Sequence, residues 1–420
     1  MLHLGVNPAF VGVTEGTVEV SSRVRRRFYT MAYYDDWPVL GIEDVNPRQQ
    51  RLYEQYEDYL LHYIKQLYDA RERYWNRDFS DLDAYVHSVE PNRQHFLDSL
   101  GGWPWERHDM HLRIEPLATT ADFRVERVYY RVFEGVESDA LLLTPLGKGP
   151  FPGVVLQIGI YGVPEVACGF TADEHAGKDS TYHRIGGRLA RHGYTVLATR
   201  MVTGFEPETL AGRFAPKLQE LKSAQPHARM YLNRLCRTIG MDLFGVEMFA
   251  LSRGVDLLES LPQVNSGRIG FYGKSQGGQS GLWLGALDTR LQAVVSTAWF
   301  NERYQKQVIP SEHYRPFALT AEEDKIYPHL HEFADSDIAS LICPRAFMVE
   351  EGKHDGAVYW KMAEQAFAEV KGIYDRLGIG ERCEIHVHEG GHEVEPIEPE
   401  EETERMHSVQ FLDRWLKGAK

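Results

Sequence analysis

Hydrophobic and polar positions repeat with two different periods along this chain, and the period changes near residue 120. Before that point, apolar and aromatic residues recur at helical spacing between residues 50 and 75, which predicts an amphipathic helix. Asn92 is suited to cap a second, shorter helix that continues to Leu100. We therefore expect residues 1–120 to form a mainly helical N-terminal extension.

Beyond residue 120, short apolar runs alternate with helical stretches. Strands are predicted at 123–132, 139–144, 153–160, 195–199, 268–272, 293–298, 346–350 and 384–388, and helices at about 180–192, 241–260, 276–287, 357–377 and 404–417. Such alternation is typical of right-handed crossovers that build a mostly parallel sheet with helices on both faces. We expect an α/β domain over 121–420 with an eight-stranded sheet, interrupted by lid-like insertions at about 201–240 and 300–341.

Composition narrows the class of protein. Apolar residues make up 43% and charged residues 25% of the 420, which is ordinary for a soluble globular protein. The net charge of −15 comes from 46 basic and 61 acidic residues, and a surface of that sign repels nucleic acid. There is no apolar run of membrane-spanning length and no secretory signal pattern, so we expect a cytoplasmic protein with no membrane partner. Nothing in the sequence indicates the oligomeric state.

The strongest chemical signal is a glycine-flanked serine between a predicted strand and a predicted helix. The strand 268–272 runs directly into Gly273-Lys274-Ser275-Gln276-Gly277, which fits the G-x-S-x-G pattern of a nucleophile elbow. The glycines permit a strained turn that raises the serine hydroxyl above the sheet. A glycine-rich turn that carries a solvated serine would have the same sequence pattern, but the strand-turn-helix context favours Ser275 as a nucleophile.

A serine hydroxyl needs a histidine base, which is itself oriented by a carboxylate. On α/β-hydrolase scaffolds these groups follow in the order serine, acid, histidine. Asp355 follows one predicted strand and His392 follows the next, so the order is present here. The rival orienting acids, each near the end of a predicted strand, are Glu302, Glu350 and Glu351.

Residues 388–392 also spell H-E-x-x-H, the signature of a zinc metalloprotease. That chemistry requires a helix, so that both imidazoles lie on one face. Gly390 and Gly391 disfavour a helix, and the alternation from Cys383 to His388 predicts a strand instead. We interpret the motif as coincidental and expect neither a metal nor a cofactor.

Three motifs give the chain its resemblance to a known family. They are Gly273-Lys274-Ser275-Gln276-Gly277-Gly278, Gly352-Lys353-His354-Asp355 and Glu389-Gly390-Gly391-His392. Over roughly residues 92–417 the chain resembles the α/β-hydrolase superfamily, and within it the dienelactone-hydrolase and acetyl-xylan-esterase-like branch. The resemblance implies Ser275 as nucleophile, Asp355 as acid and His392 as base, with no cofactor.

The resemblance also implies an oxyanion hole, one half of which would be the backbone N–H of Gln276. Relatives usually carry a His-Gly pair after the third strand, where this chain has Gln157-Ile158-Gly159-Ile160-Tyr161-Gly162. Ile160 or Tyr161 could supply the second backbone N–H, or the Tyr161 hydroxyl could contribute. Glucuronoyl esterases, a related group, place arginine directly after the serine, so Gln276 disfavours that substrate.

The function predicted from these residues is hydrolysis of a small-molecule carboxylic ester through an acyl-enzyme. A serine peptidase or a C–C bond hydrolase remains the alternative, because the same triad serves both. Two remoter alternatives are a zinc metallohydrolase that uses the HEGGH segment and a non-catalytic binding module. Trp299, Phe300 and Tyr304 suggest an aromatic-walled substrate pocket, although core packing would give the same pattern. The sequence does not identify the ester.

Overall fold

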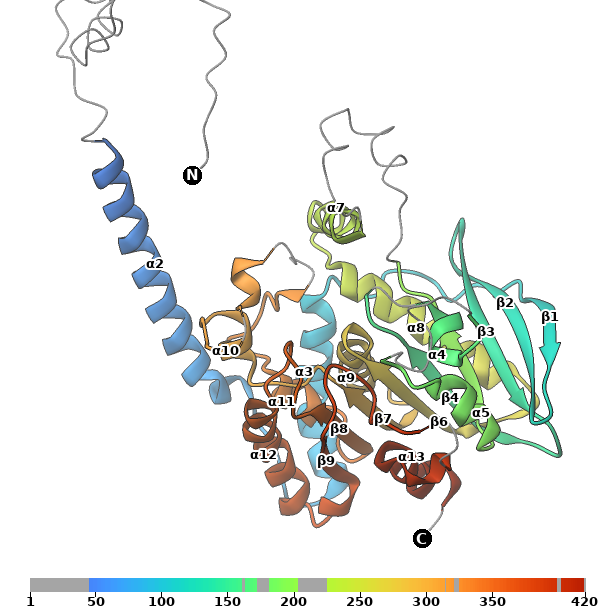
Figure 1. Cartoon of the computed structure of the whole chain (residues 1–420). Coiled ribbons are helices and arrows are strands. Elements are labelled where there is room, and N and C mark those ends of the chain that lie inside the picture. Colours follow the sequence, from blue (N-terminus) through green and yellow to red (C-terminus); the bar gives the residue numbers. More distant parts are fainter. Residues whose placement is uncertain are drawn as a thin grey trace, which may run out of the picture. The chain divides into compact units, whose positions relative to one another are not determined.

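The computed structural model describes residues 45–160, 163–171, 181–202, 225–313, 315–320, 325–398 and 402–418 (Figure 1). Contacts divide the chain into two compact units, Met1–Tyr63 and Ile64–Lys420. Helix α2 (Val45–Asp69) spans this boundary, and the catalytic candidates all lie in the second unit. Within the described ranges, no helix is both long enough and apolar enough to cross a membrane.

A nine-stranded mixed sheet forms the centre of the second unit, in the order β1-β2-β3-β5-β4-β6-β7-β8-β9. The strands are β1 (Arg113–Thr119), β2 (Phe123–Phe133), β3 (Val136–Pro145), β4 (Phe151–Gln157), β5 (Thr195–Thr199), β6 (Val264–Lys274), β7 (Leu291–Thr297), β8 (Ala346–Gly352) and β9 (Cys383–His388). The pairs β1–β2, β2–β3 and β3–β5 are antiparallel. The five remaining pairs, from β5–β4 to β8–β9, are parallel. The predicted α/β fold with a mostly parallel sheet is confirmed.

The predicted number of eight strands was wrong, because strand β1 was missed. Its residues are almost all exposed, so it lacks the apolar alternation that reveals a half-buried strand. It also contains Pro116, next to an irregularity in its pairing with β2. Proline is tolerated at the edge of a sheet and not in its centre, which agrees with the position of β1 at the end of the strand order.

Each face of the sheet has its own hydrophobic core. Val154 and Leu156 of β4 belong to one core, and Val155 between them belongs to the other. This alternation follows from the two-residue period of a strand. A strand that is buried on both faces reads as a continuous apolar run, which is why the central strands were predictable from the sequence.

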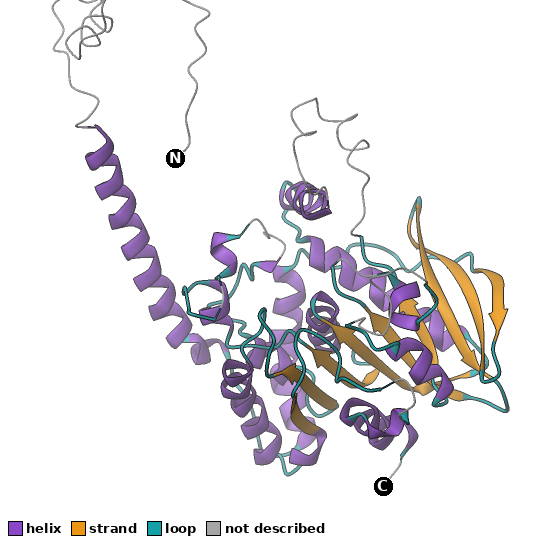
Figure 2. Ribbon diagram, viewed as in Figure 1, coloured by secondary structure: helices purple, strands orange, loops and turns teal. Residues whose placement is uncertain are grey.

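Helices cover both faces, as Figure 2 shows for the purple ribbons around the orange strands. One core includes residues of α3 (Leu82–Ser99), α8 (Leu243–Ser260), α9 (Gln276–Leu287), α11 (Asp335–Ser340) and α12 (Trp360–Arg376). The other includes residues of α4 (Pro164–Cys168), α5 (Ile185–Arg191) and α13 (His407–Leu412), which a π-helical turn at Asp413–Lys417 extends. The other described helical elements are α7 (Gln225–Arg237), α10 (Arg303–Gln307) and the 3-10 turns Arg71–Tyr74, Phe317–Leu319, Gly380–Arg382 and Thr403–Arg405.

Helix α3 begins well before the predicted cap at Asn92. Asp81 is the true N-cap, and its side chain accepts a hydrogen bond of 2.8 Å from Ala84 N. Pro91 lies inside the helix, and the Asn92 amide donates to the carbonyl of Tyr74 at 2.9 Å. The prediction placed the start too late because it took a residue suited to capping, directly after a proline, as a helix start.

Helix α3 also shares a core with the sheet-bearing part of the chain. The ring of Phe96 meets Trp283 of α9 edge-on at 5.3 Å, and the Tyr85 hydroxyl donates to the carbonyl of Ser340 at 2.9 Å. This part of the predicted extension is therefore integrated with α9 and α11. The predicted boundary at residue 120, and the two insertions, stay predictions.

Candidate active site

Ser275 occupies a strained turn between β6 and α9. Its backbone φ of 60° and ψ of −123° lie outside the regions that non-glycine residues favour. A Cβ atom on Gly273 would lie 1.9 Å from the carbonyl oxygen of Gly277, and one on Gly277 would lie 2.1 Å from that of Gln157. Only glycine fits at both flanking positions, so close backbone packing explains the G-x-S-x-G pattern.

Two hydrogen bonds connect Ser275, His392 and Asp355 in a line. The Oγ of Ser275 lies 2.8 Å from His392 Nε2, and His392 Nδ1 lies 2.7 Å from Asp355 Oδ2. The Asp355 side chain is fully buried, and its Oδ1 accepts from the backbone N–H groups of Ala357 (2.6 Å) and Val358 (3.0 Å). The structure thus brings the three predicted residues together after β6, β8 and β9, and holds the carboxylate rigidly.

The rival acids have other partners. Glu302 caps α10 by accepting from Gln305 N at 2.8 Å and also accepts from the Tyr68 hydroxyl. Glu350 accepts from the hydroxyls of Tyr272 (3.1 Å) and Thr297 (2.9 Å). Burial raises the pKa of Glu351 well above its ordinary value, and the nearby Asp355 carboxylate adds to this, so Glu351 favours its neutral form. These contacts leave Asp355 as the carboxylate beside the His392 ring.

The three side chains of the H-E-x-x-H segment also have separate partners. The segment begins at the end of β9 and continues into a turn, as predicted. His388 Nδ1 accepts from Gly390 N at 3.0 Å, and Glu389 pairs with Lys353. Because the His392 ring already contacts Ser275 and Asp355, the segment lacks the geometry of a helical zinc motif.

The loop after β4 passes close to the serine. A Cβ atom on Gly159 would lie 3.1 Å from Ser275 Cβ and 3.2 Å from the Tyr182 hydroxyl, to which the Gly159 N–H donates at 3.0 Å. Ile160 follows in this loop and is buried, whereas Tyr161 lies outside the described residues. Gln276 begins α9, so its backbone N–H belongs to the first turn of that helix, where N–H groups lack intrahelical acceptors.

Two buried groups beside the elbow were missed in the sequence. Burial lowers the pKa of Lys274 to about 8, against the opposing effect of Asp355 and Glu393, and its ammonium lies 3.2 Å from the Thr181 hydroxyl. Tyr182 is buried near the same ammonium, which lies 5.1 Å from its ring centre. The only sequence signal for Lys274 was its place next to the serine, and Tyr182 had none.

Arg229, in helix α7, was missed as well. The Gln276 side-chain oxygen, in the amide orientation that its surroundings favour, accepts from Arg229 Nη2 (2.7 Å) and Nε (3.2 Å). Arg229 also forms a paired ion contact with Glu247, at 2.6 and 2.8 Å. A buried guanidinium therefore lies next to the residue that follows the serine. The contact joins segments far apart in the sequence, so no local pattern could have indicated it.

The predicted pocket residues divide into different environments. Phe300 is fully buried and packs edge-on against Phe347 (5.9 Å) and Phe367 (6.4 Å), so it belongs to the hydrophobic core. Trp299 is close to the elbow, because a Cβ on Gly278 would lie 2.9 Å from Trp299 Cβ. Tyr304 stacks on Tyr68 at 5.1 Å. The role of Trp299 and Tyr304 in a substrate pocket stays a prediction.

Comparison with known proteins supports the fold. Residues 245–318 match the family model of acetyl xylan esterase (AXE1). YtaP from Bacillus subtilis (strain 168), which carries the assignment of hydrolase, is 25% identical over 178 residues. That match covers 42% of this chain and 56% of YtaP, so the chain spans little more than half the length of this curated relative.

Two solved structures share the architecture. A protein from Bacteroides fragilis NCTC 9343 that carries the assignment of acetyl xylan esterase superposes with a TM-score of 0.58 at 17% identity, over 77% of this chain and 80% of its own. A glucuronoyl esterase from Solibacter usitatus superposes with a TM-score of 0.54 at 16% identity, over 80% of this chain and 93% of its own. The fold is that of α/β-hydrolase esterases, as the sequence motifs predicted. The segment that matches the family model contains Ser275 but neither Asp355 nor His392.

Proposed function

We propose that the protein is a serine hydrolase that cleaves a carboxylic ester through an acyl-enzyme. Ser275 is the nucleophile, His392 the general base and acid, and Asp355 the carboxylate that orients the imidazole. The observation that carries the proposal is the line of hydrogen bonds at 2.8 and 2.7 Å, which begins at a serine in a strained elbow.

The reaction follows from these contacts. His392 Nε2 takes the proton as Ser275 Oγ attacks the ester carbonyl, and Asp355 stabilises the imidazolium that forms. The tetrahedral intermediate collapses, the C–O bond of the ester breaks, and the imidazolium returns the proton to the leaving alcohol. A water molecule, activated by the same imidazole, then attacks the acyl-enzyme and releases the acid.

The negative charge on the intermediate requires donors fixed above the serine. The backbone N–H of Gln276, at the start of α9, supplies one donor and benefits from the positive end of the helix dipole. The second donor comes from the loop after β4, as the backbone N–H of Ile160 or Tyr161. In this loop the Gly159 N–H donates to the Tyr182 hydroxyl. Loss of one such donor costs roughly 3 to 4 kcal/mol in the barrier.

The substrate class that we favour is a short-chain acyl ester, such as an acetylated carbohydrate, and not a uronate ester. The similarity to a structure assigned as an acetyl xylan esterase supports this choice. Gln276 stands where glucuronoyl esterases carry arginine, and the nearby guanidinium of Arg229 is already neutralised by Glu247. A guanidinium engaged in two charge-assisted hydrogen bonds is poorly placed to bind the carbonyl oxygen of a uronate ester.

The decisive experiment is a substrate panel on the full chain. Turnover of p-nitrophenyl esters of increasing acyl length is compared with turnover of glucuronate methyl esters and peptide anilides. We expect hydrolysis that declines from acetyl to longer acyl chains, with little turnover of the other two classes. Cleavage of anilides without esters would favour the serine peptidase, and no turnover by a folded protein would favour a binding module.

A further inference from the structure

Three histidines surround one buried glutamate at a place distinct from the serine site. Glu332 lies in a loop that also carries His329 and His331, and His95 comes from helix α3. The Glu332 side chain is 11% exposed, while the imidazoles are 50% (His95), 38% (His329) and 32% (His331) exposed. The arrangement is a carboxylate at the base of a shallow cluster, with imidazoles that solvent can reach.

The distances in this cluster suit a small tetrahedral ion. Two ligand atoms that bind zinc at about 2.0 to 2.1 Å with tetrahedral angles lie about 3.3 Å apart. The carboxylate oxygens of Glu332 lie 2.8 Å from His95 Nε2, 3.3 Å from His329 Nδ1 and 3.6 Å from His331 Nε2. The ligand atoms of His329, His331 and Glu332 all lie within 4.8 Å of one another. His95 is not part of this group of three, so a four-donor site requires its ring to move from its contact with Glu332 toward His329 and His331.

The surrounding contacts hold the donors in place. The carbonyl of Glu332 accepts from Trp75 Nε1 at 3.0 Å, which anchors the loop. The His95 ring packs against Phe333 at 5.7 Å, and the His329 and His331 rings stack at 5.8 Å. Metal sites depend on such supporting contacts to orient their ligands.

The chemistry of the donors also favours a transition metal. Imidazole and carboxylate donors without thiolate suit zinc and the neighbouring first-row ions.

We propose that His95, His329, His331 and Glu332 form a binding site for a divalent first-row transition metal of the zinc type. Four protein donors complete a tetrahedral shell, which is the pattern of structural sites and not of catalytic ones. The ion would clamp helix α3 to the 329–332 loop. Its role would be stability, and the chemistry at Ser275 would not depend on it.

A second histidine cluster provides a matched control. His386 Nε2 and His407 Nδ1 both lie near Glu395 Oε1, at 3.1 and 2.9 Å, and their rings stack at 3.6 Å. The other oxygen of Glu395 accepts from the backbone N–H of His407 at 2.7 Å. Among the residues that the structure describes, this cluster offers three side-chain donors, so we expect it to bind zinc more weakly than the first.

The test is a zinc titration of the full chain after removal of metals with a chelator, in competition with a chromogenic zinc indicator. We expect one tight equivalent of Zn²⁺ in the wild type. His331→Ala and Glu332→Gln should lower the zinc affinity of that site by about tenfold to a hundredfold or more, since even loss of a supporting contact costs this much. His407→Ala should retain it.

Thermal unfolding separates binding from misfolding. Zn²⁺ should raise the Tm of the wild type and of His407→Ala, and leave that of His331→Ala unchanged. The metal-free forms of all three should unfold at similar temperatures. The proposal is overturned if the wild type binds no stoichiometric zinc, if His331→Ala and Glu332→Gln bind as tightly as the wild type, or if only His407→Ala loses the ion.

Discussion

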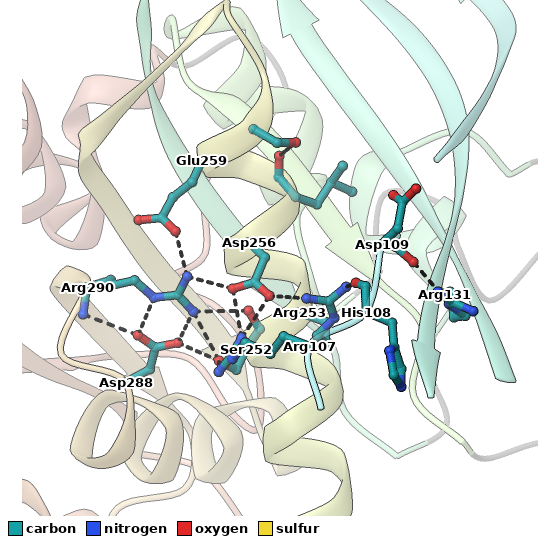
Figure 3. Close-up of polar contacts among 12 residues, drawn as sticks. Arg107, His108, Asp109, Arg131, Ser252, Arg253, Asp256, Glu259, Asp288 and Arg290 are labelled. Atoms are coloured by element: carbon teal, nitrogen blue, oxygen red, sulfur yellow. Dashed lines mark hydrogen bonds and ion pairs between the residues drawn. The ribbon is translucent and has the colours of Figure 1, made fainter. Parts of the chain in front are cut away.

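Two polar networks in this molecule each pair a buried carboxylate with a nitrogen-containing side chain. They differ in whether the last group of the network has a reactive hydroxyl. One is the line from Asp355 through His392 to Ser275. The other lies around Arg290, between α9 and β7, where its guanidinium contacts Asp256 (2.6 Å), Glu259 (2.5 Å) and Asp288 (2.6 Å) (Figure 3). Each joins residues far apart in the sequence, and each contains a buried carboxylate.

The arginine network closes on itself. Ser252 donates to Asp288 at 2.7 Å, and Arg107 binds both oxygens of Asp256 at 2.7 and 2.8 Å, so both carboxylates have several donors (Figure 3). The serine line instead ends on a hydroxyl held in a strained turn. A closed network of ion pairs stabilises the fold. The line of hydrogen bonds ends instead on Ser275, whose strained backbone is typical of an active-site residue. We expect mutations in the first to cost stability and mutations in the second to cost rate.

The largest loss of activity should come from a change at Ser275, the last residue of the hydrogen-bonded line. Ser275→Ala removes the nucleophile and should lower kcat by about 10⁴ to 10⁶, while the Tm changes little. Loss of labelling by a fluorophosphonate, checked by mass spectrometry of the intact protein, provides a second readout. A variant with wild-type turnover would refute the proposed nucleophile.

The next effect tests the acid. Asp355→Asn keeps the shape of the side chain and removes its charge, which should cost about 10⁴ in kcat. Glu350→Gln is the matched control, because Glu350 is also buried but contacts hydroxyls and not the imidazole. Steady-state kinetics with both variants would contradict the assignment if the control were dead and Asp355→Asn were active.

In the closed network the expected loss is in stability. Burial opposes ionisation of Asp288, but hydrogen bonds from Arg290 outweigh it and hold the pKa of Asp288 below its ordinary value. Asp288→Asn leaves Arg290 with one fewer carboxylate and should lower the free energy of unfolding by roughly 3 to 5 kcal/mol. Denaturant unfolding measures the loss, and kcat per folded molecule should stay within about twofold. A large loss of kcat would show that the two networks are coupled.

A change at Lys274 should have the smallest effect on stability, because it removes a single charge beside the elbow. Burial lowers its pKa to about 8 in the folded protein, from an ordinary value of 10.5. Below pH 8 the folded protein carries a buried ammonium at Lys274. Between pH 8 and 10.5 this amine is mostly neutral in the folded protein but still protonated in the unfolded chain. The unfolded chain then binds more protons, so the Lys274 amine makes stability rise with pH. Lys274→Met should remove that rise and stabilise the protein at pH 7 by on the order of 2 kcal/mol. Unfolding curves at pH 7 and 10 would contradict this if the variant kept the same rise.

Local patterns in the sequence were sufficient for the centre of the fold and for the order of the catalytic candidates. The central strands read as apolar runs because both of their faces are buried, as Val154 and Val155 illustrate. Gly273 and Gly277 were informative because the elbow brings backbones too close for any Cβ. The positions of Asp355 and His392 followed from the ends of two predicted strands, since the carboxyl ends of parallel strands meet at one edge of the sheet.

Only the tertiary structure decided the features that depend on contacts between distant segments. Strand β1 has no buried face, so its place was set by pairing with β2 and not by its own pattern. Arg229 reaches Gln276 from another helix, and Phe300 turns into the core next to Trp299, which is near the elbow. Sequence periodicity reports which face of an element is apolar. It does not report which segment covers that face, because that depends on packing across the whole chain.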